Sequence, residues 1–223
     1  MIGVVRGRLG LERPGARDAG ISLAELLVAM MVFAVLLSLT GGFMISAYRA
    51  NQTNDSVDRT TRTASTALLQ MTRMIRAASD FKTTGGVSNS AFVTMGSSDV
   101  TLVSYVNLED ALEKPVKVQY VVEGTKLVER RWAGRQSVND ATLYTFPTLT
   151  STVTLAEPVL APADGGPTLF SYLQADRTTA AADVTAIGAV RVQLQVGTTS
   201  RGADSTLLVN TVGINNGSSQ GTP

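Results

Sequence analysis

The residues that could carry chemistry in this sequence are few and scattered. The 223-residue chain contains no histidine and no cysteine, which removes the commonest general base and the usual ligands of transition metals. It also lacks the glycine-rich phosphate loops, the nucleophile elbow and the EF-hand spacing that mark other chemistries. No nucleophile can be paired with a base, so we expect a protein that is not an enzyme and that uses no cofactor and no metal.

Two polar clusters remain to be weighed. Asn107, Glu109 and Asp110 form an acidic patch that either binds a hard cation or is a solvated loop. The triplet Arg-Arg-Trp at 130–132 either grips DNA or another polymer, or simply ends an exposed strand. The net charge of +1 gives no bulk electrostatic case for nucleic-acid binding. For both clusters the surface interpretation is favoured, and no nucleic-acid partner is predicted.

A third polar feature stands at the start of the most apolar part of the chain. Ser22 and Glu25 have the Ser-x-x-Glu spacing of a capping box, in which side chains satisfy free backbone amides at a helix start. From residue 26 to residue 39 only Ser38 is polar. A carboxylate within a membrane segment costs about 2.5–3.5 kcal/mol at mid-bilayer and less near an end. Glu25 is therefore a candidate for a role beyond capping.

The apolar block, residues 21–48, is long enough to cross a membrane. A helix over residues 26–47 would be about 33 Å long, against about 30 Å for a hydrocarbon core. A secretory signal peptide would have a shorter apolar run and no acid at its mouth. A plain single-pass anchor, oriented by the arginines of residues 1–20, leaves Glu25 unexplained. The third interpretation treats residues 20–26 as a processing motif.

Residues 20–26, Gly-Ile-Ser-Leu-Ala-Glu-Leu, resemble the prepilin peptidase site of type IV pilins and type II secretion pseudopilins. The resemblance implies that residues 1–20 are a leader peptide, that cleavage falls between Gly20 and Ile21, and that Ile21 becomes N-methylated. It also implies an assembly role for Glu25, which in this family pairs with the N-terminal amine of a neighbouring subunit. The leader holds four arginines and two acids, so the remaining chain has 15 basic and 16 acidic residues, a net charge of −1.

A finer resemblance, to the larger J-type minor subunits, lies in residues 69–77, in residues 118–127 together with Arg130, and in residues 190–196. It implies a minor pilin or pseudopilin, a structural subunit that forms or primes the tip of a type IV pilus or of a type II secretion pseudopilus. The implied partners are the prepilin peptidase, other pilin or pseudopilin subunits, the membrane and an assembly platform. The implied location is a single membrane pass with the leader in the cytoplasm and the rest outside, followed by a surface filament or pseudopilus. The alternative is a bitopic, membrane-anchored surface protein with a β-rich binding ectodomain.

The helical pattern continues beyond the membrane-length block, which predicts one helix over residues 21–79. In its second part, residues 49–79, one stripe recurs at steps of four and three, as is typical of a helix face packed on a sheet. The stripe consists of Val57, Thr61, Ala64, Leu68, Met71, Ile75 and Ala78.

Gly41 and Gly42 interrupt the apolar block, and each costs about 1 kcal/mol in a helix interior. By resemblance to pilins, whose helix loosens in this region on assembly, the two glycines are a candidate hinge. The other interpretation is that they allow close packing of helices.

From residue 80 the period of the apolar pattern changes to two, which indicates β-strands. The predicted strands are 91–95, 100–106, 116–123, 126–132, 143–146, 152–155, 169–173, 189–196 and 206–214. Residues 156–167 are expected to be a loop. One long helix followed by hairpins predicts an α+β fold in which a long N-terminal membrane-spanning helix packs on an antiparallel β-sheet head, as in pilins.

The predicted organisation follows from these patterns. A leader is expected at 1–20, a membrane or assembly part of the helix at 21–48, its amphipathic part at 49–79, a β-rich head at 80–214 and a flexible tail at 215–223.

Overall fold

The computed structural model describes residues 22–83, 86–105, 114–140, 142–198 and 205–214. The chain divides into two compact units, residues 1–50 and residues 51–223. One helix, α1 (Leu23–Arg76), contributes residues 23–50 to the first unit and residues 51–76 to the second. The second unit adds antiparallel sheets, so the fold belongs to the predicted α+β class.

Helix α1 ends earlier than the sequence suggested. The predicted helix ran to residue 79, but α1 stops at Arg76, with Arg73 and Arg76 in its last turn. Cations there interact favourably with the exposed carbonyls of a helix C-terminus. Ala78, which was expected on the helix, instead forms an antiparallel bridge with Ser104. Strand pairing therefore replaces the last predicted turn.

The larger sheet has five antiparallel strands in the order β3-β4-β5-β6-β9. Their bounds are β3 (Phe92–Met95), β4 (Asp99–Ser104), β5 (Val116–Glu123), β6 (Lys126–Ala133) and β9 (Leu149–Ala156). The predicted hairpin joins β5 to β6, with Glu123 opposite Lys126. Gly124 has a φ of 59° in the turn, a left-handed conformation that glycine adopts without steric cost.

The smaller sheet has three antiparallel strands in the order β10-β11-β12. They are β10 (Phe170–Leu173), β11 (Ala189–Val196) and β12 (Thr206–Gly213). All three match predicted strands within one residue at each end. Strands β11 and β12 pair over their whole length, from Ala189 opposite Gly213 to Val196 opposite Thr206. The predicted final hairpin is therefore confirmed in its strands.

Short elements were missed or misjudged. Two small ribbons, β1 (Phe81–Lys82) with β2 (Ser88–Asn89) and β7 (Arg135–Gln136) with β8 (Tyr144–Thr145), are two residues long on each side. The predicted strand 143–146 is only β8. The predicted loop 156–167 contains the tail of β9 and a 3-10 helix, η1 (Pro162–Asp164). Segments this short offer no alternation from which they could be recognised.

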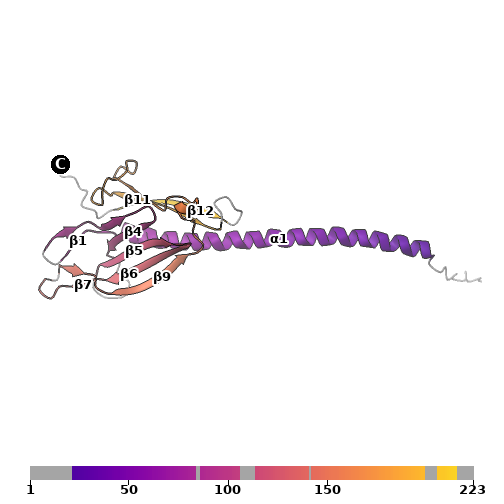
Figure 1. The fold of residues 1–223 in the computed structure, drawn as a ribbon, viewed down its shortest axis with the longest axis horizontal. Helices are drawn as coiled ribbons and strands as arrows, with labels where there is room; N and C mark the ends of the chain where they lie inside the picture. Colours follow the sequence, from indigo (N-terminus) through magenta and orange to yellow (C-terminus); the bar gives the residue numbers. More distant parts are fainter. Residues whose placement is uncertain (1–21, 84–85, 106–113, 141, 199–204, 215–223) are drawn as a thin grey trace, which may run out of the picture. The chain divides into compact units, whose positions relative to one another are not determined.

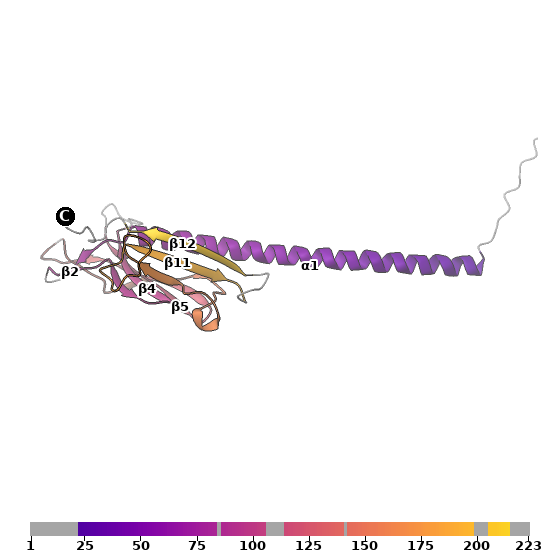
Figure 2. The same cartoon turned by 90° about the horizontal axis from the view of Figure 1, so that it is seen from above.

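In the second unit, residues of α1 lie between the two larger sheets. Figure 1 shows β4, β5, β6 and β9 on one side of this part of α1, and β11 and β12 on the other; Figure 2 shows β11 and β12 from above. A single apolar core joins Met71 and Ile75 of α1, Leu102 of β4, Tyr120 of β5 and Val192 of β11. The helix stripe is thus core, as predicted, but it is covered by two sheets and not by one.

Polar contacts fix the helix against β12. The hydroxyls of Thr60 and Thr61 lie 3.3 Å and 3.1 Å from the Thr206 hydroxyl. Three turns further along, the Asn210 side-chain amide donates to the Thr72 hydroxyl at 3.0 Å. These contacts set the position of the helix along the strand.

Candidate functional site

The first unit presents the start of α1, where the sequence placed its candidate site. The Glu25 backbone amide donates to the Ser22 hydroxyl at 3.2 Å, and the Leu26 amide donates to the Ser22 carbonyl at 3.1 Å. Ser22 therefore caps the helix N-terminus, which satisfies one of the free amides of the first turn. The half of the capping box that depends on Ser22 is confirmed.

Glu25 lies in the first helical turn and is exposed. A carboxylate at this end of a helix interacts favourably with the partial positive charge of the free amides. Gly20 and Ile21, the residues predicted to flank the cleavage point, lie outside the described residues. Their predicted cleavage and methylation stay predictions.

The apolar segment that follows Glu25 is not covered by any described residue of its own unit. Every residue from 22 to 50 is exposed, and α1 contains a window with a mean hydropathy of 2.4 of which no part is buried. The large side chains Leu27, Phe33 and Leu36 are each more than half exposed. A helix that is apolar on all sides must be covered by lipid or by protein. By length and composition, α1 is able to cross a membrane.

Gly41 and Gly42 leave the helix unbroken. Helix α1 runs through both positions, and a β-carbon added at either one would meet nothing within 4 Å. Directly before them, the Thr40 hydroxyl donates to the Leu36 carbonyl at 2.8 Å, a local bond that satisfies the hydroxyl within the helix. Among the described residues, packing therefore does not require glycine at these positions, and their role as a hinge or a packing surface stays a prediction.

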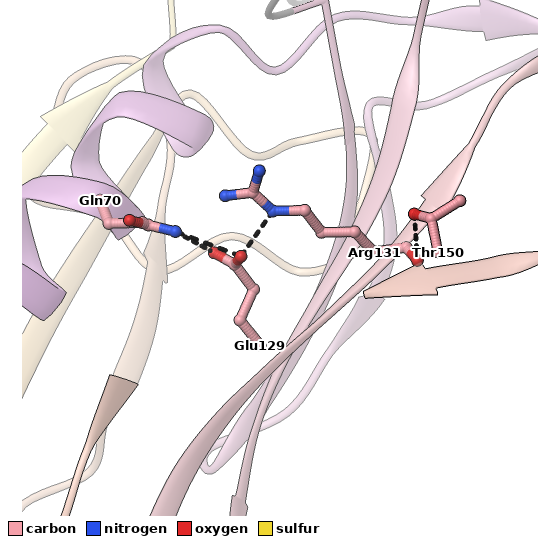
Figure 3. Close-up of polar contacts among 4 residues, drawn as sticks. All are labelled: Gln70, Glu129, Arg131 and Thr150. Atoms are coloured by element: carbon pink, nitrogen blue, oxygen red, sulfur yellow. Dashed lines mark hydrogen bonds and ion pairs between the residues drawn. The ribbon is translucent and has the colours of Figure 1, made fainter. Parts of the chain in front are cut away.

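The second unit contains a buried polar cluster that the sequence did not reveal. Glu129 of β6 is only 1% exposed and accepts hydrogen bonds from the Gln70 side-chain amide at 2.9 Å and 3.2 Å. It also accepts a charge-assisted bond of 2.5 Å from Nε of Arg131. Figure 3 shows the Glu129 carboxylate held between Gln70 of α1 and Arg131 of β6. The cluster therefore ties the helix to the larger sheet.

Tyr120 of β5 completes this cluster from the neighbouring strand. It lies directly opposite Glu129 in the register of β5 and β6, and it is fully buried. Burial first, and then the nearby Glu129 charge, raise the pKa of the Tyr120 hydroxyl well above its ordinary value. Within the described part of the chain this hydroxyl has no hydrogen-bond partner. The tyrosine is thus held neutral beside a charged acid.

Next to this cluster lies an open groove of about 480 Å³. Its lining comes from α1 and from one residue of β6. The lining residues are Thr66, Leu69, Gln70, Arg73, Met74 and Arg131. We call it the α1–β6 groove. It combines two guanidinium groups with apolar side chains, which suits an anionic group that carries apolar surface.

The triplet Arg-Arg-Trp at 130–132 does not act as one unit. Strand alternation places Arg131 on the face with Glu129, whereas Arg130 binds Glu123 at 2.6 Å on the other face. Nζ of Lys117 lies 4.4 Å from the centre of the Trp132 ring, within the range of a cation–π contact. The surface interpretation therefore holds for Arg130 and Trp132 but not for Arg131.

The predicted acidic patch at Asn107, Glu109 and Asp110 lies outside the described residues. Among the residues that are described, no group of three or more acidic side chains is arranged to hold a metal ion.

The sequence contains one signal of the pairing in the buried cluster. Leu127, Glu129 and Arg131 alternate along a single strand, so they share one face. Strand alternation therefore allows Glu129 and Arg131 to pair, but it does not show that the pair is buried.

Comparison with protein-family models gives no match, and a search of curated protein sequences gives none at a significant level.

Proposed function

We propose that this chain is a minor pilin or pseudopilin, a structural subunit built into a type IV pilus or a type II secretion pseudopilus through its apolar helix. The observation that carries the proposal is the exposure of every residue from 22 to 50 in the first unit, while the second unit has a core of its own. Such a segment exists to be buried elsewhere. A membrane before assembly and neighbouring helices after assembly would cover it in turn.

The position of Glu25 supports this proposal over a plain anchor. After cleavage between Gly20 and Ile21, the new amine of Ile21 would lie about one helical turn from the Glu25 carboxylate. In a dry bundle of helices, pairing between the acid of one subunit and the amine of the next would set the axial register. Any slip would leave two buried charges without partners, which is strongly unfavourable.

In this proposal the prepilin peptidase removes the leader and N-methylates Ile21. The assembly platform then moves the subunit from the membrane, where the leader lay on the cytoplasmic side, into the filament. The chain itself supplies no catalysis. The second unit would remain outside the membrane and form the outer surface of the filament or its tip.

The N-terminus of the protein made in its own cells tests the proposal directly. Mass spectrometry of the purified chain should find N-methyl-isoleucine at Ile21 as the first residue. A protein that begins at Met1, or one that begins at Tyr48 after loss of the apolar segment, would contradict it.

A second experiment separates the filament subunit from a bitopic surface binding protein. Glu25→Ala should abolish incorporation into filaments and leave membrane insertion intact. The matched control is Asp58→Ala, because Asp58 is an exposed acid of the same helix that pairs with Arg62 at 3.5 Å. Ser22→Ala adds a second control, since it removes the cap and keeps the charge. If both acid variants assemble normally, the binding-protein alternative is favoured.

A further inference from the structure

The α1–β6 groove has a cationic and apolar lining that nothing within the described part of the chain fills. Arg131 contributes only Nε to Glu129, and Figure 3 shows its two terminal nitrogens directed away from that carboxylate. Among the described residues these two nitrogens have no hydrogen-bond partner, and Arg73 makes no ion pair. The groove therefore offers free guanidinium donors at its wall.

The charges of the groove do not cancel. Glu129 is neutralised by Arg131, and the Gln70 amide donates to both of its oxygens. Arg73 then remains as an uncompensated positive charge on the helix side. Because Glu129 is buried below the surface, an incoming group meets the guanidinium nitrogens before it meets the acid.

Apolar side chains line the groove beside these donors or lie on the neighbouring edge strand. Leu69 of α1 lines the groove and is 70% exposed. Val153 of the edge strand β9 lies opposite Glu129 in the register of β6 and β9, and it is 46% exposed. A bound group would therefore contact apolar side chains next to the guanidinium donors, a combination that a free inorganic anion does not use.

We propose that the α1–β6 groove docks an acidic segment of a partner protein, in which a carboxylate stands beside a large apolar side chain. The carboxylate would accept from the terminal nitrogens of Arg131 and from Arg73, because guanidinium groups match carboxylates in shape and charge. The apolar neighbour would cover Leu69. The inference goes beyond the proposed function, because it concerns the second unit alone and requires neither cleavage of the leader nor filament assembly.

The probe for this site is a fluorescein-labelled pentapeptide of alternating leucine and glutamate, with blocked ends, added to the full chain in detergent. Its partner is the same peptide with glutamine in place of glutamate. Fluorescence anisotropy should show binding of the acidic peptide that weakens with added salt, and binding of the glutamine peptide about tenfold weaker.

The variants decide whether binding occurs in this groove. Arg73→Gln should weaken binding about tenfold, as expected for a lost charge-assisted bond. Arg76→Gln is the matched control, because Arg76 is exposed on the same last turn and does not line the groove. Leu69→Ser should weaken binding of the acidic peptide without changing its salt dependence. Arg131→Lys, which keeps the charge beside Glu129, should also weaken binding because lysine has no planar fork.

Three results would overturn the proposal. The first is the absence of binding at millimolar peptide. The second is an equal loss of binding in the variants at residues 73 and 76, which would indicate a diffuse charge effect. The third is displacement of the peptide by an equal concentration of inorganic phosphate with no effect of the serine variant at Leu69, which would indicate a site for small anions. None of these depends on the state of the N-terminus, so failure here leaves the proposed function standing.

Discussion

Tyr120 of β5 faces Glu129 of β6 across an antiparallel register, and both side chains are buried. The acid is satisfied by Gln70 and Arg131, whereas the Tyr120 hydroxyl has no hydrogen-bond partner among the described residues. The opposite holds for Tyr172, which is also buried in the core. Its hydroxyl is 2.9 Å from the Gly96 carbonyl and 3.1 Å from the Asp99 carbonyl.

This contrast predicts different effects of removing the two hydroxyls. Tyr172→Phe should lower the free energy of unfolding by about 1 kcal/mol, because it removes the hydrogen bond that the Tyr172 hydroxyl donates to the Gly96 or Asp99 carbonyl. Tyr120→Phe should lower it by less than Tyr172→Phe, because the Tyr120 hydroxyl interacts with Glu129 but makes no hydrogen bond of normal geometry. Urea unfolding of the detergent-solubilised chain, followed by fluorescence of the single tryptophan, measures both. A larger loss in Tyr120→Phe than in Tyr172→Phe would contradict the assignment.

Tyr120 also bears on stability in alkali. Its pKa is raised, by burial first and by Glu129 second, whereas tyrosines of the unfolded chain ionise near pH 10. The neutral form is therefore favoured by folding, so stability is complete below about pH 10 and falls as the pH rises above it. Tyr120→Phe should flatten this fall, which can be checked by repeating the urea titrations between pH 8 and about 11.

The ion pair of Glu129 should matter far more than its exposed counterpart. Glu129→Gln leaves the Arg131 guanidinium, whose side chain is 20% exposed, without its anion and should cost about 2 kcal/mol. Glu123→Gln breaks the ion pair between Arg130 and Glu123, whose side chains are 31% and 47% exposed, respectively. This change should cost less than about 1 kcal/mol. Equal costs in urea unfolding would show that the buried pair has no special weight.

The sequence was sufficient to predict the long helix and the longer strands of this fold, but not its short ribbons or the arrangement of its strands. The apolar residues of a helix recur about every 3.6 positions and those of a strand every second position, because one face of each element is buried. The stripe through Met71 and Ile75 is therefore predictable from the sequence alone. Alternation tells which face of a strand is buried and not which strand lies beside it, so the division into two sheets around α1 could not be predicted.

The buried cluster was missed for a related reason. Composition and pattern treat a charged residue as a surface residue, because charges are seldom buried unless they are paired. Pairing depends on which side chains the fold brings together, and Gln70 lies 59 positions from Glu129. At the other end of the chain, Ser22 was correctly predicted as a cap because capping is local. Long-range polar contacts leave no such local pattern.

The two faces of α1 in the second unit should respond differently to truncation. Ile75 is fully buried, and Ile75→Ala should cost about 3 kcal/mol through lost burial and a residual cavity. Leu69 is 70% exposed, and Leu69→Ala should stay within about 0.5 kcal/mol. Thermal and urea unfolding of the two variants provide the comparison. Similar losses of stability in the two variants would mean that the helix is rotated about its axis relative to the described packing.

Two turns between β10 and β11 should depend on ionised aspartates. The Thr179 hydroxyl donates to Asp176 at 2.6 Å, and the Thr185 hydroxyl donates to Asp183 at 2.6 Å. These hydroxyl bonds first, with backbone amides next, lower the pKa of both carboxyls. A lowered pKa means that the stabilising bonds are complete above the unfolded pKa of about 3.9 and are lost as the pH falls through the folded value.

The corresponding experiment follows the carboxyl carbon of each aspartate by NMR during an acid titration. Thr179→Val should raise the pKa of Asp176 and leave that of Asp183 unchanged, and Thr185→Val should do the reverse. A common shift of both aspartates in either variant would indicate that the loop responds as a whole and that the individual hydroxyl bonds do not set the pKa values.

The glycine pair of the apolar segment gives a prediction that separates its two interpretations. Gly41→Ala and Gly42→Ala should each favour the helix by about 1 kcal/mol, and neither should alter the unfolding of the second unit, because an added β-carbon would meet nothing within 4 Å. Circular dichroism and urea unfolding in detergent test this.

Consecutive residues of a helix point about 100° apart, so only one of the two glycines can face a given neighbouring helix. If the pair is a hinge, both alanine variants should impair filament incorporation to a similar degree and the double variant more. If it is a packing surface, one variant should impair incorporation and the other should not. A loss of stability in the second unit would contradict the open surroundings of the two glycines.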